Sequence, residues 1–471
     1  MELFLEGETN KKNNLLKFHN LFYSLFSESK NLYFFIVLIN FCLMMDVAIA
    51  TIPDFIPQYI ISPLGISTFF LIVAVSIFGQ LYLQKFAEKD NKDLLSKSKY
   101  LSTLSKINKI ACYVLIGNLI SLIISIGIFS TYSIINLLIG NNISCFIGSF
   151  MLGSLGIKFI IWYMARRNSL IILFYGLGFL FFAFSILIIF LSDNLLLLDK
   201  PFLITPEIPI SYPDIKNNIF GIITKYTVYL HTISFILLLV ASYLLLSQYS
   251  DKINKYKLIM ALIIVFIIYM TSTLNSFNIL EIPLYDENLF YYYIFQSLKT
   301  TLEGIIYGYS FWKVATKLDI HNPIRKYLII SANGFILIYF ITQSTVIASA
   351  YPPYGIPSLS FIIISIYLLT FGIYSSAVSL SHDIHLRHTI RTLTSQKASL
   401  FGNIGQAQMT SELQKVVTDL KGLVEKEEEE LKEKTGIESN ITEETVKDYM
   451  EQVLQELETS KKKRINTNSP L

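Results

Sequence analysis

Long apolar runs, separated by short polar segments, make up most of this chain up to about residue 380. Each run is close to the about 20 residues that a helix needs to cross about 30 Å of hydrocarbon. Lipid offers no partners to backbone N–H and C=O groups, so such runs span as helices. We therefore predict an all-α fold, a transmembrane bundle of ten helices. The predicted spans are residues 33–50, 64–84, 108–129, 143–164, 169–191, 226–248, 256–276, 289–312, 326–348 and 357–379.

The composition supports a bilayer as the main partner of the chain. Of the 471 residues, 53% are hydrophobic and 15% are charged, and the mean hydropathy is +0.52. A water-soluble core cannot bury so much apolar surface. The net charge of +3 is small, and we expect no nucleic-acid partner. The three cysteines, Cys42, Cys112 and Cys145, lie in apolar runs and match neither a disulfide framework nor a metal-binding spacing.

The distribution of basic residues predicts the orientation, because cytoplasmic loops carry an excess of lysine and arginine. With the N-terminus inside, the inner segments before the tail hold 20 basic residues and the outer loops hold three. We predict a cell-membrane protein with both termini in the cytoplasm. The expected divisions are a cytoplasmic N-terminal segment (1–32), the bundle (33–379) and a helical cytoplasmic tail (380–471).

Proline and glycine placement predicts where the helices are interrupted. Eleven of the 13 prolines fall in predicted outer loops and none falls inside a span, so the spans should be mostly continuous. The apolar stretch from Ile134 to Met164 is too long for one upright span, and we expect Gly140-Asn141-Asn142 to break off a short outer helix. The largest outer loop, 192–225, contains Asp193 and should form a cap with little regular structure.

Apart from lysines at the first two positions of a span, four charged residues lie within the predicted spans: Asp46, Lys158, Lys299 and Glu303. Charges in hydrocarbon are costly and usually face the bundle interior or water. Lys299 and Glu303 are four residues apart and share one helical face. We expect them to form a pair, which either fixes helix packing or forms an internal polar site, an ion or proton relay, or a lock. Gly304 and Gly308 on the following turns should allow a close helix approach.

Other polar residues in the spans are weaker candidates. Asp46 lies near the outer end of the first span and is a candidate intramembrane site residue. Lys158 is placed to extend toward the headgroups. His231, in the sixth span, is expected to be a hydrogen-bonded packing residue. Five uncharged polar residues either bond between helices or line a small cavity: Gln80, Asn118, Asn275, Asn333 and Gln343.

The segment after the last span is rich in histidine and arginine. His382, His385 and His388 recur every third residue, and Arg387 and Arg391 accompany them as juxtamembrane candidates. On a helix the histidines share part of one face. This leaves three interpretations: a metal site, a pH-sensitive patch or a solvated face. Because no other segment supplies further ligands, we favour the solvated face and predict no metal.

The tail differs sharply from the bundle. From residue 380 it holds 13 basic and 16 acidic residues. Apolar residues recur with 4-3-4-3 spacing, which is typical of a packed amphipathic helix or a short coiled coil. We expect two or three helices that bind a protein partner or self-associate. The apolar positions are Met409, Leu413, Val416, Leu420 and Leu423.

The last span and the tail contain a set of distinctive short segments. They are Tyr374-Ser375-Ser376-Ala377, Ser379, Ser381, Asp383, Leu386-Arg387, Ile390-Arg391, Ile404-Gly405, Ala407-Gln408-Met409, Thr435-Gly436 and Thr442-Glu443-Glu444. These residues resemble segments of uncharacterised multi-pass membrane proteins of ammonia-oxidising archaea. The likeness covers about the last 100 residues, and the earlier spans share only the general architecture. The resemblance implies that the last span runs directly into a basic helix, and it supplies no activity.

No phosphate-binding glycine loop, nucleophile elbow or paired-cysteine motif occurs in the sequence. We therefore expect a protein that is not an enzyme and holds no cofactor. The leading hypothesis is a membrane sensor or scaffold whose tail reports to a partner. The alternative is a secondary transporter or permease that uses Lys299 and Glu303 as its midplane polar site.

Overall fold

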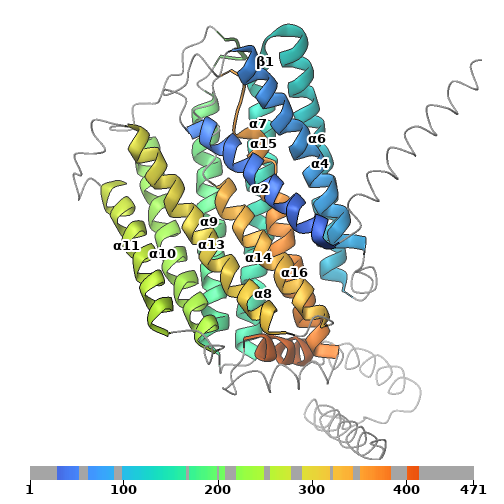
Figure 1. Cartoon of the computed structure of the whole chain (residues 1–471), viewed down its shortest axis with the longest axis vertical. Coiled ribbons are helices and arrows are strands. Elements are labelled where there is room, and N and C mark those ends of the chain that lie inside the picture. Colours follow the sequence, from blue (N-terminus) through green and yellow to red (C-terminus); the bar gives the residue numbers. More distant parts are fainter. Residues whose placement is uncertain are drawn as a thin grey trace, which may run out of the picture.

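The computed structural model describes residues 29–51, 62–89, 98–165, 169–198, 201–206, 219–248, 255–276, 289–318, 322–342, 351–382 and 400–412. They form a bundle of long helices with one two-stranded pairing (Figure 1). The elements are α2 (Ser29–Thr51), α4 (Pro63–Lys89), α6 (Lys99–Phe129), β1 (Tyr132–Ser133), α7 (Ile134–Asn142), η1 (Ile143–Ile147), α8 (Gly148–Ala165), α9 (Leu170–Leu198), β2 (Leu203–Ile204), α10 (Ile219–Gln248), α11 (Lys255–Ser276), α13 (Leu289–Lys317), α14 (Pro323–Ile341), α15 (Ile356–Leu359) and α16 (Ile362–His382). A further helix covers residues 400–412.

Seven helical segments of the described residues are long and apolar enough to cross a membrane. This confirms the prediction of an all-α, multi-pass membrane protein. The helices α2, α11 and α13 occupy the other three predicted positions. The seven segments are Pro63–Ala87, Lys99–Phe129, Ile134–Ala165, Leu170–Leu195, Lys225–Ser247, Pro323–Ile341 and Ile356–Ser381.

The fourth span is not divided as predicted. A π-helical segment, η1, joins α7 to α8, so helical structure runs from Ile134 to Ala165. We expected Gly140-Asn141-Asn142 to break off a separate helix. A π segment instead accommodates the irregularity while the backbone stays hydrogen-bonded within the helix, which lipid requires.

The helix α16 is the centre of the bundle (Figure 1). The most apolar stretch of Ile356–Ser381 is completely buried, whereas only 39% of the corresponding stretch is buried in the spans of α4, α6 and α10. The helices α14, α6, α8 and α4 pack around α16. Protein therefore surrounds α16, and the outer helices present much of their apolar surface to lipid.

Glycines allow the helices α13, α14 and α16 to pack closely against one another. A Cβ atom added at Gly308 of α13 would lie 2.8 Å from the Ala332 carbonyl oxygen of α14. One added at Gly334 of α14 would lie 2.6 Å from the Leu369 nitrogen of α16. Both distances are shorter than a side chain tolerates. The expected close approach at Gly308 is thus confirmed, and it holds α13 tightly against α14.

The predicted outer loop 192–225 contains more regular structure than expected. The helix α9 continues to Leu198, so Asp193 lies in a helix and is 7% exposed. Further along, β2 pairs antiparallel with β1, with Tyr132 opposite Ile204. Residues 207–218 of this loop lie outside the described part of the chain.

The last predicted span is also interrupted. It consists of α15 and α16, with Ser360 and Phe361 between them. Gly355 precedes α15 with a φ of 92°, a left-handed conformation that glycine adopts without steric cost. The sequence predicted one continuous helix over 357–379, and it missed this short first turn.

Candidate functional site

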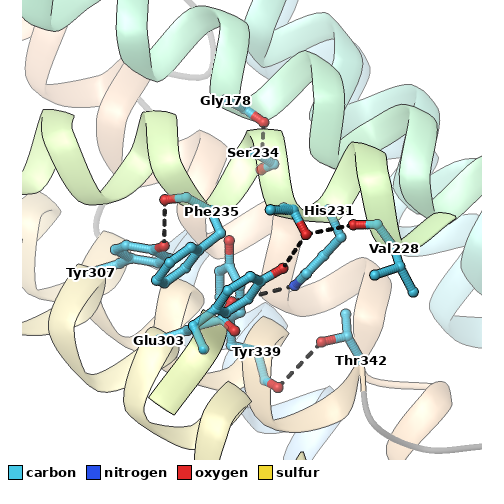
Figure 2. A network of polar contacts seen from close by, with 11 residues as sticks. Gly178, Val228, His231, Ser234, Phe235, Glu303, Tyr307, Tyr339 and Thr342 are labelled. Atoms are coloured by element: carbon cyan, nitrogen blue, oxygen red, sulfur yellow. Dashed lines mark hydrogen bonds and ion pairs between the residues drawn. The ribbon is translucent and has the colours of Figure 1, made fainter. Parts of the chain in front are cut away.

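The main candidate site is a buried cluster of ionisable and aromatic side chains where α10, α11, α13 and α14 meet (Figure 2). Glu303 of α13 is at its centre and is 0% exposed. Its Oε2 atom lies 3.4 Å from Nε2 of His231 on α10, whose side chain is 17% exposed. Two titratable groups from different helices are therefore in contact in the interior of the bundle.

Lys299 does not form the predicted direct pair with Glu303. Its Nζ atom lies 4.2 Å from the centroid of the Tyr269 ring, in a cation–π contact with α11. Side chains on a helix lean toward its N-terminus, so a lysine that precedes a glutamate by four residues leans away from it. Lys299 is 8% exposed and remains within electrostatic range of Glu303.

Aromatic rings enclose the carboxylate. Phe182 of α9 stacks on Tyr339 of α14 at 5.0 Å and meets the His231 ring edge-on at 5.5 Å. Tyr269 stacks on Phe235 at 3.7 Å. Such apolar surroundings make an uncompensated charge expensive.

Two of the nearby tyrosine hydroxyl groups are directed away from Glu303. Tyr307 donates to the Phe235 carbonyl oxygen at 3.1 Å (Figure 2). The hydroxyls of Thr232 and Tyr269 are 3.2 Å apart. Among the described residues, neither carboxylate oxygen of Glu303 accepts a hydrogen bond. Buried carboxylates normally accept several. Glu303 departs from this pattern within the described part of the chain.

Asp46 is surrounded quite differently. It is 0% exposed, and its Oδ1 accepts the Gly355 N–H at 3.1 Å. Its Oδ2 accepts the Ser358 N–H at 2.9 Å and the Ser358 hydroxyl at 2.6 Å. The carboxylate thereby satisfies backbone donors at the start of α15 and ties α2 to it. The structure places this candidate in a structural joint and not in the Glu303 cluster.

A polar and aromatic network joins the helix 400–412 to the bundle. Trp162 of α8 donates from Nε1 to Oε1 of Gln408 at 2.9 Å. Gln408 donates from Nε2 to the Tyr374 hydroxyl of α16 at 3.3 Å and to Glu412 at 2.8 Å. Phe401 meets Phe311 of α13 edge-on at 5.9 Å. We call this end of the bundle, where α8, α13 and α16 finish, the tail end.

The tail end also contains Lys158. Its Nζ atom lies 5.2 Å from the centroid of the Tyr100 ring and 5.9 Å from that of Tyr374. We expected this lysine to extend toward the headgroups. Instead its ammonium group lies against aromatic rings, which stabilise a cation by about 0.5–2 kcal/mol.

The juxtamembrane candidates are mostly outside the described residues. His382 is the last residue of α16. His385, Arg387, His388 and Arg391 lie in the segment 383–399, which the structure does not describe. Among the described residues, no group of three or more histidine, cysteine, aspartate or glutamate side chains could hold a metal ion.

Sequence reasoning missed the contact between His231 and Glu303. The two residues are 72 positions apart and lie in the sixth and eighth predicted spans. The available signal was that each is a titratable residue inside a predicted span. The helix order in the bundle, which the sequence does not specify, is what brings them together.

Comparison with known proteins gives no family for this chain: no protein-family model matches it, and neither curated proteins nor solved structures show significant similarity to it.

Proposed function

We propose that this protein is a non-enzymatic membrane sensor or scaffold whose bundle communicates with a partner-binding cytoplasmic tail. In this proposal the protein crosses the cell membrane ten times, and both of its termini lie in the cytoplasm. The helices α2, α11 and α13 supply the three spans beyond the seven apolar ones. The excess of basic residues in the predicted inner segments supports the orientation.

The observation that carries this proposal is the seating of the helix 400–412 against the tail end of the bundle. Leu400, Phe401, Ile404 and Ala407 are each at most 1% exposed. A Cβ atom added at Gly405 would lie 2.5 Å from Cβ of Leu380, so the helix is in close contact with α16. The central helix and the start of the tail are therefore packed as one unit, and a movement of α16 displaces the tail.

The test compares the full chain with a chain that ends after residue 412, both purified from native membranes under the same conditions. We expect a partner protein to be retained in stoichiometric amount by the full chain and lost with the truncation. A variant with Leu413 and Leu420 changed to serine keeps the length and should also lose the partner. If all three chains retain the same proteins, the tail has no partner-binding role.

A secondary transporter or permease is the second candidate, because the Glu303 carboxylate is buried and accepts no hydrogen bond from the described residues. Intramembrane charges of this kind commonly mark substrate or ion pathways. The test is uptake into liposomes that contain the purified chain or Glu303→Gln, with a panel of ions and small metabolites. Uptake that Glu303→Gln abolishes supports this candidate. Equal uptake by the two proteins and by empty liposomes counts against it.

A further inference from the structure

We propose that His231 and Glu303 together form a binding site for one exchangeable proton inside the bundle. This inference goes beyond the proposed function, because it holds whether or not the tail binds a partner. The ligand is a single proton. Two side chains in contact are enough to bind it.

The geometry of the pair is suited to sharing a proton. The atoms Nε2 of His231 and Oε2 of Glu303 are 3.4 Å apart, slightly longer than a hydrogen bond. The bound proton forms an N–H group on an imidazolium that faces a carboxylate. When it moves to Oε2, the N–H bond breaks, an O–H bond forms, and the positive and negative charges both disappear. Either state holds the same single proton, so the pair acts as one site.

Burial provides the driving force for binding. Glu303 is 0% exposed and neither oxygen receives a hydrogen bond from the described residues, so the bare carboxylate carries a large desolvation cost. A shared proton removes most of that cost. His231 is the more accessible member, with 17% of its side chain exposed. The imidazole is the more exposed member of the pair and the carboxylate is the fully buried one.

The titratable groups that face the pair come from three helices. The helix α13 contributes Lys299 and Tyr307, α11 contributes Tyr269, and α14 contributes Tyr339. The helix α9 contributes the neutral ring of Phe182. The hydroxyls of Tyr307 and Tyr269 already have partners.

Lys299 is the basic group among these neighbours. Its ammonium group lies over the Tyr269 ring rather than on the carboxylate, so Glu303 stays open to a proton. A cation at this place repels the incoming proton and thereby weakens its binding. Lys299 thus acts as a positioning residue that sets how tightly the pair holds the proton.

The experiment is infrared difference spectroscopy of the full chain in liposomes, titrated from about pH 5 to about pH 8. Protonated carboxyl groups give a carbonyl band that is separate from the bands of carboxylates. Subtracting the Glu303→Gln spectrum from the wild-type spectrum isolates the contribution of Glu303 to this band. We expect this contribution to change with pH. The variant His231→Phe keeps an aromatic ring but cannot bind a proton. In this variant the pH dependence of the Glu303 contribution should change. In Lys299→Met, the carboxylic acid band should persist to higher pH.

The controls address the other buried carboxyl groups and folding. Asp46→Asn and Asp193→Asn should leave the Glu303 contribution unchanged. Gel filtration identifies variants that misfold, and Lys299→Arg, which keeps the charge, should titrate like the wild type. A Glu303 contribution that does not vary with pH overturns the proposal. So does a pH dependence that is identical in the wild type and His231→Phe.

Discussion

Asp46 and Glu303 are both fully buried carboxylates on helices of the same bundle, yet their surroundings differ. Asp46 accepts two backbone N–H groups and one hydroxyl around α15. Glu303 accepts none from the described residues, and its Oε2 atom lies 3.4 Å from Nε2 of His231. Equal burial therefore goes with different hydrogen bonding, because the packing around each carboxylate decides how many donors are directed at it.

The largest expected effect is that of removing Asp46. Asp46→Ala leaves the Gly355 and Ser358 donors unpaired inside the bundle and should lower the free energy of unfolding by about 4 kcal/mol. Denaturant unfolding of the purified protein measures the loss. Asp46→Asn, which keeps one carbonyl oxygen as an acceptor, should lose about half as much. A loss below about 1 kcal/mol for Asp46→Ala would show that these hydrogen bonds do not stabilise the fold.

A smaller effect is expected at the tail end from the loss of Gln408, whose amide group is paired but uncharged. Gln408→Ala removes the acceptor of Trp162 Nε1–H and the donor to Tyr374, and should cost about 1.5 kcal/mol. Limited proteolysis should then cut within residues 400–412 sooner than in the wild type. Gln406→Ala, on the same helix and half-buried, is the matched control. Equal cleavage rates in the two variants would contradict the role assigned to Gln408.

A double-mutant cycle tests which residue is the true partner of Glu303. The coupling energy between His231→Phe and Glu303→Gln should be about 1 kcal/mol, because these side chains touch. The coupling between Lys299→Met and Glu303→Gln should be less than half of that, because the lysine lies on Tyr269. If Lys299 shows the larger coupling, the direct ion pair that the sequence predicted forms in the membrane after all.

The smallest expected effect is that of Glu303→Gln alone. The carboxylate accepts no hydrogen bonds from the described residues, and removing its desolvation cost offsets the lost attraction to His231 and Lys299. The free energy of unfolding should change by about 0.5 kcal/mol or less. The same denaturant measurement as for Asp46→Ala decides it. If Glu303→Gln lowered the free energy of unfolding as much as Asp46→Ala, the two carboxylates would stabilise the fold equally.

Much of the fold follows from the sequence because apolar runs of membrane-spanning length leave few alternatives. Each of the ten predicted spans overlaps a helix in the described part of the chain, and seven helical segments there are long and apolar enough to cross a membrane. The details that failed are local. The π segment after Asn142 and the separate turn Ile356–Leu359 depend on packing against neighbouring helices, which no hydropathy pattern records.

The candidate site was predicted only in part. Lys299 and Glu303 were identified because charges in apolar runs are conspicuous, and both are buried as expected. Their partners were not. Four residues of separation on one helix favoured a pair between them, whereas the structure offers each a partner from another helix, Tyr269 for the lysine and His231 for the glutamate. Contacts between helices depend on their order and rotation in the bundle.

The sequence by itself determined that the chain enters a membrane as a set of helices, because the bilayer requires long apolar segments with internally paired backbones. It also determined which spans contain charged residues. The tertiary structure decided which helix is enclosed by the others, which carboxylate is satisfied and which is left open. The physical reason is that hydropathy acts on each segment alone, whereas hydrogen bonding and charge compensation in the bundle depend on side chains from several helices.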